Sequence, residues 1–239
     1  MQIACESIAF PGIEIQAVAI PESDQFRAEK VFSYIDLAYA AIETVKIAWS
    51  YREKVDGILL AGFSDVGLDP LREMLDIPVV GIGEASCLMA SLLGHRFSIL
   101  TGTDKWTPPK QDTLARLGLT ERLASLRSYS EWSGTSSHEE ILTCLEDASR
   151  HCIDHDGAEA IVIGAGPLVG FGKPLQDRLG VPVIDPTLCG YLELESCIRL
   201  GVSHSKQRKW RVAPSMISDS EGVYNYCRNW MYHSTGGNG

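Results

Sequence analysis

The chain has 239 residues, of which 45% are hydrophobic and 22% charged, and its formal net charge at pH 7 is -10. An acidic balance argues against nucleic acid as a partner. No stretch approaches the roughly 18 uninterrupted apolar residues that a membrane span needs, and the opening MQIACESIAF lacks the basic and apolar regions of a secretory signal. We therefore expect a cytoplasmic protein with a small-molecule substrate, and neither nucleic acid nor membrane as a partner.

The cysteine pattern indicates reduced thiols in a reducing compartment. The chain has seven cysteines, an odd number, and no CxxC pair, so a zinc ribbon or a thioredoxin-like site is not expected. The histidines are scattered, and His151 and His155 lie four apart without a third ligand nearby in the sequence. We therefore predict no metal site.

The pattern of apolar residues predicts alternating strands and helices. The expected strands are Ile13–Ile20, Ile58–Ala61, Ile77–Val80, Phe97–Thr101, Ile161–Gly164 and Val181–Ile184. The expected helices are Ala28–Arg52, Leu71–Leu75, Glu84–Leu93, Pro108–Leu117, His138–His155, Leu175–Leu179 and Leu188–Leu200.

One strand–loop–helix–strand unit is written twice. Residues 58–82 read ILLAGFSDVGLDPLREMLDIPVVGI and residues 161–185 read IVIGAGPLVGFGKPLQDRLGVPVID. Gly62 falls opposite Ala165, Gly67 opposite Gly170, and Pro78 opposite Pro182 after one inserted residue. Continuous apolar strands joined by short helices predict parallel sheets.

The fold class that we predict is α/β, with two pseudo-symmetric parallel-sheet lobes and an active site between them. We expect residues 1–100 together with 205–228 to form the first lobe, 101–204 the second, and 229–239 a flexible tail. In such sheets ligands sit at the carboxyl ends of the strands, which here are the loops 62–67 and 165–170, Thr101–Thr103 and Asp185–Cys189.

At these loops the chain resembles the aspartate/glutamate/hydantoin racemase superfamily, in its hydantoin and allantoin racemase branch. The matching stretches are AGFSDVGLDPLREMLDIPVVGIGEAS, HRFSILTGT and DGAEAIVIGAGPLVGFGKPLQDRLGVPVIDP. The resemblance implies two α/β lobes of similar fold, cofactor-free proton transfer by one cysteine from each lobe, and dimers or higher homo-oligomers.

The sequence departs from this family pattern at both reactive positions. Motifs like A-C-F-G-D-P-G-L and G-C-A-G-M-V-G-F are replaced by AGFSDVGL and GAGPLVGF, so that Gly62 and Ala165 stand where the resemblance places the thiols. The family's opening strand is expected to be absent or replaced by Met1–Cys5, and Ala4–Ala9 resembles the helix that follows the family's first loop. A two-thiol racemase mechanism therefore lacks its acid and base.

The remaining residues favour a roomier, more apolar site with a few hydrogen-bond donors. Backbone N–H groups of 63–66 and 165–168 can polarise a carbonyl, although Pro167 removes one donor. The catalytic candidates are Ser64, Asp65, Thr101, Thr103 and Cys189. The candidates for substrate binding are Gly62, Phe63, Val66, Trp106, Ala165, Gly166, Pro167, Leu168 and Asp185. Phe171 is a further aromatic candidate, equally suited to the core.

Three functions remain open from the sequence. The first is a cofactor-independent isomerase or cyclase that acts on an apolar carbonyl compound by positioning and by backbone polarisation, in secondary metabolism. The second is a hydantoin- or amino-acid-type racemase or epimerase with a substituted base such as Cys189 or Asp65. The third is a ligand-binding protein without turnover.

Overall fold

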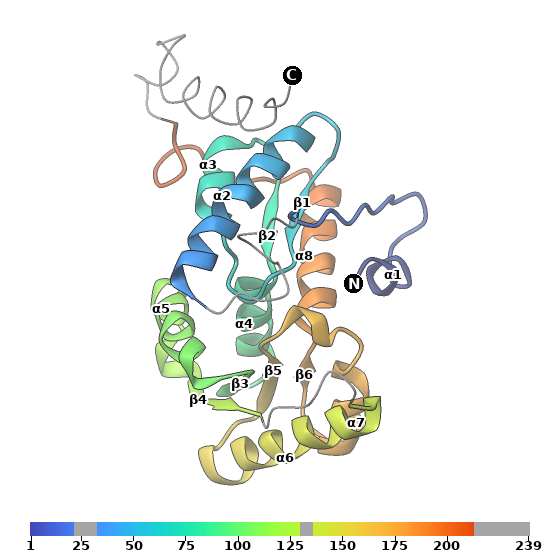
Figure 1. Ribbon diagram of the computed structural model, residues 1–239, viewed down its shortest axis with the longest axis vertical. Coiled ribbons are helices and arrows are strands. Elements are labelled where there is room, and N and C mark those ends of the chain that lie inside the picture. Colours follow the sequence, from blue (N-terminus) through green and yellow to red (C-terminus); the bar gives the residue numbers. More distant parts are fainter. Residues whose placement is uncertain (22–32, 130–135, 213–239) are drawn as a thin grey trace. The chain divides into compact units, whose positions relative to one another are not determined.

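The computed structural model describes residues 1–21, 33–129 and 136–212 of the chain (Figure 1). Its helices are α1 (Gln2–Glu6), α2 (Tyr34–Tyr51), α3 (Leu68–Met74), α4 (Ile82–Leu93), α5 (Thr107–Leu117), α6 (His138–Asp156), α7 (Gly172–Leu179) and α8 (Pro186–Leu200). Its strands are β1 (Ile58–Leu60), β2 (Val79–Gly81), β3 (Phe97–Thr101), β4 (Leu123–Ser128), β5 (Ala160–Ile163) and β6 (Val183–Ile184). Short 3-10 turns are η1 (Asp104–Trp106), η2 (Thr120–Arg122) and η3 (Gly166–Leu168).

The chain divides into two compact units. The first comprises Met1–Val18, Leu59–Asp65 and Val80–Arg199, and the second comprises the described parts of 19–58, 66–79 and 200–239. This is a division by contact, whereas the lobes expected at 1–100 with 205–228 and at 101–204 are a division by internal symmetry, and their boundaries stay a prediction. The tail expected at 229–239 lies outside the described residues.

The main sheet lies in the first unit and has the strand order β4-β3-β5-β6. Its three strand pairs are parallel, and Ile99 of β3 lies opposite Leu126 of β4 and Val162 of β5. β1 and β2 form a separate two-stranded sheet. The repeated unit is therefore real: each copy runs strand, loop, helix, strand, helix, as β1-α3-β2-α4 and as β5-α7-β6-α8. The α/β class with parallel sheets is confirmed.

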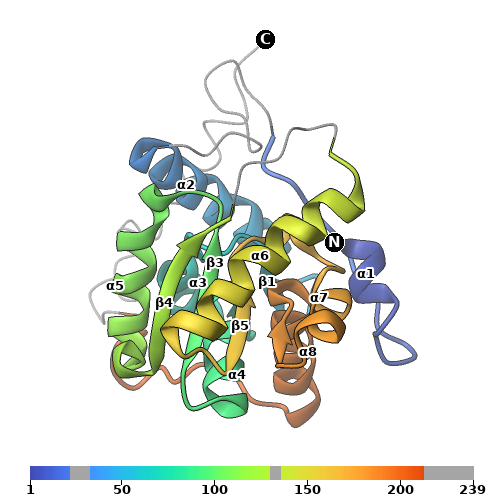
Figure 2. The same cartoon turned by 90° about the horizontal axis from the view of Figure 1, so that it is seen from below.

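Helices cover both faces of the main sheet, because its central strands are apolar on both sides. One core cluster joins β3 and β5 to α4, α5 and α8, through side chains such as Phe97, Cys87 and Cys189. The other joins the opposite face to α6 and α7, through side chains such as Leu145 and Leu175. Figure 2 shows α6 lying across β4, β3 and β5.

The structure corrects two expectations near the N-terminus. Ile13–Ile20 alternates like a strand but forms none, and most of its residues are exposed. Instead of a strand partner, its Ala17 N–H donates to the side-chain carbonyl of Gln2 at 3.0 Å. Of the residues Ala4–Ala9, which are expected to be helical, only 4–6 lie in α1, which begins at Gln2 and ends at Glu6.

Two further elements differ from the sequence prediction. β4 was not expected, although it pairs with β3 along its whole length. The helix expected at Ala28–Arg52 is described from Tyr34, where Ser33 and Asp36 form a capping box; residues 28–32 lie outside the described residues. Among the helices of the described ranges, none has both the length and the apolar content to cross a membrane.

Candidate active site

The loop after β1 is fixed by a buried carboxylate. Asp65 has a φ of 48°, unusual for a residue with a side chain, and its N–H donates to the Gly62 carbonyl at 2.9 Å to close a turn. Its carboxylate accepts the N–H groups of Gly83 at 2.9 Å and Glu84 at 2.7 Å. Asp65 thus caps the start of α4 and holds the loop against it.

The loop after β5 is fixed in a comparable way by Asp185. This carboxylate stands at the end of β6 and accepts the N–H of Gly170 at 2.6 Å, of Thr187 at 3.1 Å and of Leu188 at 3.2 Å. Burial raises the pKa of the Asp185 carboxyl, and these backbone hydrogen bonds act in the opposite direction. Both predicted aspartates therefore hold backbone, which is a positioning role.

The two loops approach each other closely inside the first unit. A Cβ added at Gly166 would lie 2.5 Å from the carbonyl oxygen of Ala61, so only glycine allows this approach. A Cβ added at Gly62 would meet nothing within 4 Å. The position where the resemblance places the first thiol is therefore open space beside the meeting point of the loops.

Few backbone N–H groups in these loops lack a protein acceptor. In the second loop, Ala165 and Leu168 donate to carbonyl groups, and Pro167 has no N–H. Of the donors expected at 165–168, only the Gly166 N–H has no acceptor among the described residues. In the first loop, the N–H groups of Phe63 and Ser64 likewise have no acceptor within the described ranges.

The end of β3 adds hydroxyl groups near the same sheet edge. Thr101 is buried, and its Oγ1 donates to the Thr103 carbonyl at 3.3 Å, so that it shapes the turn into η1. The Tyr129 hydroxyl lies 3.2 Å from where a Cβ of Gly102 would stand, and burial raises the Tyr129 pKa to about 12. Sequence reasoning missed Tyr129, because it follows the unexpected strand β4.

Cys189, the thiol considered as a substitute base, belongs to the core. Cys87 and Cys189 lie in one buried cluster, and the Cys189 Sγ donates to the Ala85 carbonyl at 3.6 Å. Burial raises the pKa of each thiol to about 12, so both are protonated at neutral pH. Nothing in this placement makes Cys189 available as a base.

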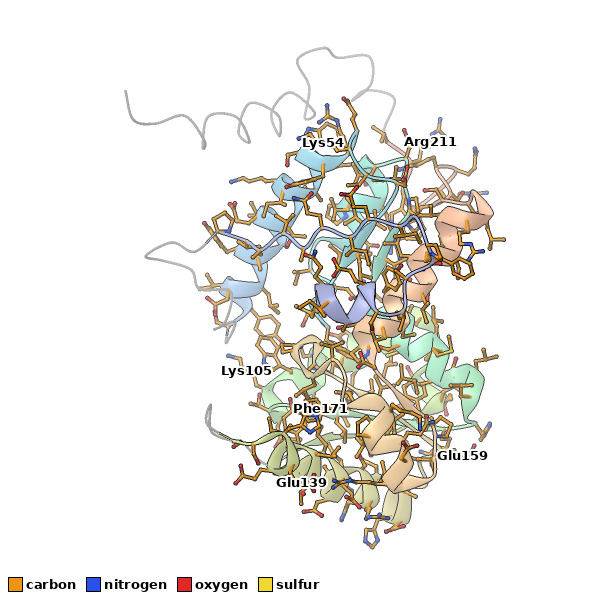
Figure 3. The ribbon with its side chains drawn as sticks, turned by 90° about the vertical axis from the view of Figure 1, so that its right-hand side faces the viewer. Lys54, Lys105, Glu139, Glu159, Phe171 and Arg211 are labelled. Carbon is orange, nitrogen blue, oxygen red and sulfur yellow. The ribbon has the colours of Figure 1, made fainter. Side chains whose placement is uncertain are left out.

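The other predicted residues differ in their exposure to solvent, from exposed through half-buried to buried. Gly62, Ser64 and Pro167 are exposed, whereas Phe63, Val66, Trp106, Thr103 and Ala165 are half-buried. Leu168 is buried in the α6–α7 core cluster together with Phe171. Phe171 stacks on the His138 ring at a centroid distance of 4.3 Å, and Figure 3 shows it lying against α6. Phe171 is therefore a core residue.

Lys110 on α5 is the charged residue that sequence reasoning missed. Its Nζ lies 5.3 Å from the centroid of the Phe63 ring, and its side chain is half-buried. No carboxylate of the described residues lies within ion-pair distance of it. Burial lowers the Lys110 pKa from 10.5 to about 8, although the neighbouring Cys87 thiol acts in the opposite direction.

The described ranges contain no group of three or more His, Cys, Asp or Glu side chains placed to hold a metal ion. The site combines a few free N–H donors, the Phe63 ring and one amine. Such a set can bind a carbonyl group and move a proton.

The contact of Asp65 with Gly81 can be tested by substitution. A Cβ at Gly81 would lie 2.3 Å from the Asp65 Cγ, so Gly81→Ala must displace the carboxylate that caps α4. We expect the free energy of unfolding to fall by about 1–3 kcal/mol in denaturant titration. Gly62→Ala, which meets open space, is the matched control and should change it by less than about 0.5 kcal/mol. Equal stability of the two variants would contradict the cap.

Lys110 should make stability depend on pH. Because its pKa is about 8 in the folded protein and ordinarily 10.5, the unfolded state binds more protons between these values. Lys110→Met should therefore raise the free energy of unfolding at pH 7 by roughly 1–3 kcal/mol, and the gain should shrink toward pH 10.5. Lys173→Met, on an exposed side chain, is the control. A gain independent of pH would contradict the lowered pKa.

Comparisons with known proteins agree with this architecture. The family model described as Asp/Glu/Hydantoin racemase matches residues 15–193. The hydantoin racemase of Pseudomonas sp. (strain NS671) is 31% identical over 230 residues, which are 95% of this chain and 90% of that protein. The hydantoin racemase of Paenarthrobacter aurescens is 36% identical over 159 residues, 65% of this chain and 67% of that one.

Solved structures extend the likeness to three dimensions. Allantoin racemase from Klebsiella pneumoniae has a TM-score of 0.81 and 28% identity, with 89% of this chain and 86% of that chain covered. Allantoin racemase from Pseudomonas fluorescens has a TM-score of 0.77 and 32% identity, with 89% and 90% covered. The chain therefore belongs to the Asp/Glu/hydantoin racemase family, in its hydantoin racemase branch.

Proposed function

We propose that this chain is an isomerase that inverts a carbon stereocentre beside a carbonyl group in a hydantoin-type cyclic ureide. The relatives named hydantoin racemase, similar over up to 95% of the chain, support this substrate class. The observation that carries the proposal is the pair of loops after β1 and β5. They meet at Ala61 and Gly166, and each is held by a buried carboxylate.

The loops supply what such a reaction needs first, a place for developing negative charge. Removal of a proton beside a carbonyl group turns the carbonyl oxygen into an enolate oxygen. Backbone N–H groups fixed before the reaction stabilise that oxygen without reorganisation. The N–H groups of Phe63, Ser64 and Gly166 have no acceptor among the described residues and are the donors that we assign to this task.

The proton itself is not moved by a thiol pair in this proposal. Glycine at 62 and alanine at 165 carry no titratable atom. The thiols of Cys87 and Cys189 are core groups with pKa values of about 12. The proposal therefore needs a base of another kind, and it needs no organic cofactor.

A second candidate function follows from the same two replacements. Without a titratable atom at 62 or 165, and with open space beside Gly62, the site can also fold a flexible apolar carbonyl compound into a reactive conformer. Isomerisation or cyclisation of such a compound, in secondary metabolism, needs no proton transfer to carbon. The two candidates differ in whether hydrogen on the reacting carbon exchanges with solvent.

Solvent exchange distinguishes the candidates. In D2O, (S)-5-benzylhydantoin or (S)-allantoin incubated with the protein should lose its ring C–H signal in proton NMR above the uncatalysed rate, and inversion should appear by chiral chromatography at a matching rate. Iodoacetamide treatment should leave both rates within about twofold, because the two thiols near the site stay protonated.

Other outcomes of this experiment decide between the alternatives. Catalysed isomerisation or ring closure of an apolar carbonyl compound without deuterium uptake would establish the second candidate. Binding of these compounds without any turnover would instead mark a ligand-binding protein. Loss of activity after iodoacetamide treatment would indicate that a cysteine is the base.

Restoring the thiols tests whether the loops still hold the substrate in family fashion. Gly62→Cys combined with Ala165→Cys should raise the inversion rate at least about tenfold, because general acid–base groups contribute about 10²–10⁴-fold, and should make the rate sensitive to iodoacetamide. Gly62→Ser with Ala165→Ser is the matched control, with groups of similar size that do not ionise near neutral pH. No gain over this control would place the reacting carbon elsewhere.

A further inference from the structure

The proposed inversion needs a base, and one described residue near the loop after β1 can provide it. We propose that the Lys110 Nζ is the proton-transferring group of this site and works from the Phe63 side, in place of the thiol that Gly62 lacks. The inference rests on the proposed function and adds to it the identity of the base.

The position of Lys110 follows from the start of α5. Pro108 and Pro109 occupy the first helical turn, where a missing N–H is tolerated, and Lys110 comes directly after them. Its Nζ lies 5.3 Å from the centroid of the Phe63 ring. Phe63 directly follows Gly62 and carries one of the N–H groups assigned to the enolate oxygen. The Lys110 amine therefore lies beside the residue that provides this donor.

The surroundings of Lys110 favour its neutral form. Burial is the larger influence on its pKa, which is about 8, and the Cys87 thiol acts in the opposite direction. The other charged side chains on the elements packed around α5 are Asp65, Glu84, Asp104, Lys105, Glu121 and Arg122. None of their carboxylates lies within ion-pair distance of the Lys110 Nζ.

The other titratable groups that we considered near the loops either accept backbone hydrogen bonds or have a pKa far from neutrality. Asp65 and Asp185 accept backbone N–H groups, and transfer of a proton to either would weaken the loop that it holds. The hydroxyl of Tyr129 has a pKa of about 12. Lys110 is thus the described group beside the first loop whose pKa lies near neutrality and which holds no backbone in place.

The step balances with solvent water as the second proton source. The neutral Lys110 amine takes the proton from the carbon beside the carbonyl, and the C–H electron pair becomes the enolate. Water then protonates the opposite face, because Ala165 has no titratable atom, and leaves hydroxide. The Lys110 ammonium returns its proton to that hydroxide, so that amine and water are both restored.

The experiment measures C–H exchange of (S)-5-benzylhydantoin in D2O with the full-length protein. Lys110→Met and Lys110→Arg should each lose at least about 100-fold in rate, which is the lower range of general-base catalysis. The arginine variant keeps the positive charge but cannot deprotonate. Lys105→Met is the control, on an exposed lysine that points outward in Figure 3, and should stay within about threefold.

Two further readouts separate proton transfer from a structural role. In the wild-type protein, kcat/KM should rise with pH through a pKa near 8, since the neutral amine is the active form. In Lys110→Ala, added methylamine should restore exchange in proportion to its neutral fraction, because a small amine can enter the space left by the side chain. A merely structural lysine would give neither result.

The outcomes distinguish this inference from the proposed function. Wild-type exchange that persists in Lys110→Met would overturn the role of Lys110 and leave the proposed function standing. Activity retained in Lys110→Arg would make Lys110 an electrostatic anchor instead of a base. A wild-type protein without exchange on hydantoins or allantoin would overturn the proposed function and this role with it.

Discussion

Two buried carboxylates fix the part of the structure on which any chemistry here depends. Asp65 and Asp185 each accept backbone N–H groups from a loop or from a helix start, and hydrogen bonds to a charged acceptor contribute about 1.5–3 kcal/mol apiece. They keep the loops after β1 and β5 in one conformation. The loop N–H groups that have no protein acceptor are therefore held at fixed positions, which the proposed stabilisation of an enolate oxygen requires.

The two copies of the repeated unit carry this carboxylate on different elements. In the first copy the carboxylate belongs to the loop, at Asp65, and the strand end is Gly81. In the second copy the strand end carries Asp185, and the loop position opposite Asp65 is Leu168. A side chain on Gly81 would collide with the Asp65 carboxylate, so the first copy has no room for a second carboxylate at its strand end. Both copies therefore have a carboxylate that caps a helix, but it comes from the loop in the first copy and from the strand end in the second.

The sequence was informative where a pattern is repeated and uninformative where packing decides. The strands at 58–60 and 160–163 and the helices after them follow from apolar runs and glycines. Alternation at Ile13–Ile20 predicted a strand that the exposed chain does not form, because no strand edge pairs with it there. Lys110 was missed because a lysine after two prolines in a polar helix start resembles a solvated residue. Its pKa is lowered by burial, which depends on how α5 packs and not on the local sequence.

The site is symmetric in its backbone and asymmetric in its side chains. On the first-loop side, the structure offers Phe63 and the amine of Lys110; on the second-loop side, Ala165 and Pro167 offer no titratable atom. Two opposed thiols can exchange roles for the two stereoisomers of a substrate, but one amine cannot. A single base must treat the two faces of the reacting carbon differently, and solvent must serve the second face. Because solvent provides or accepts the proton on that face, each inversion at such a site exchanges the hydrogen on the reacting carbon with solvent. This holds in both directions of the reaction.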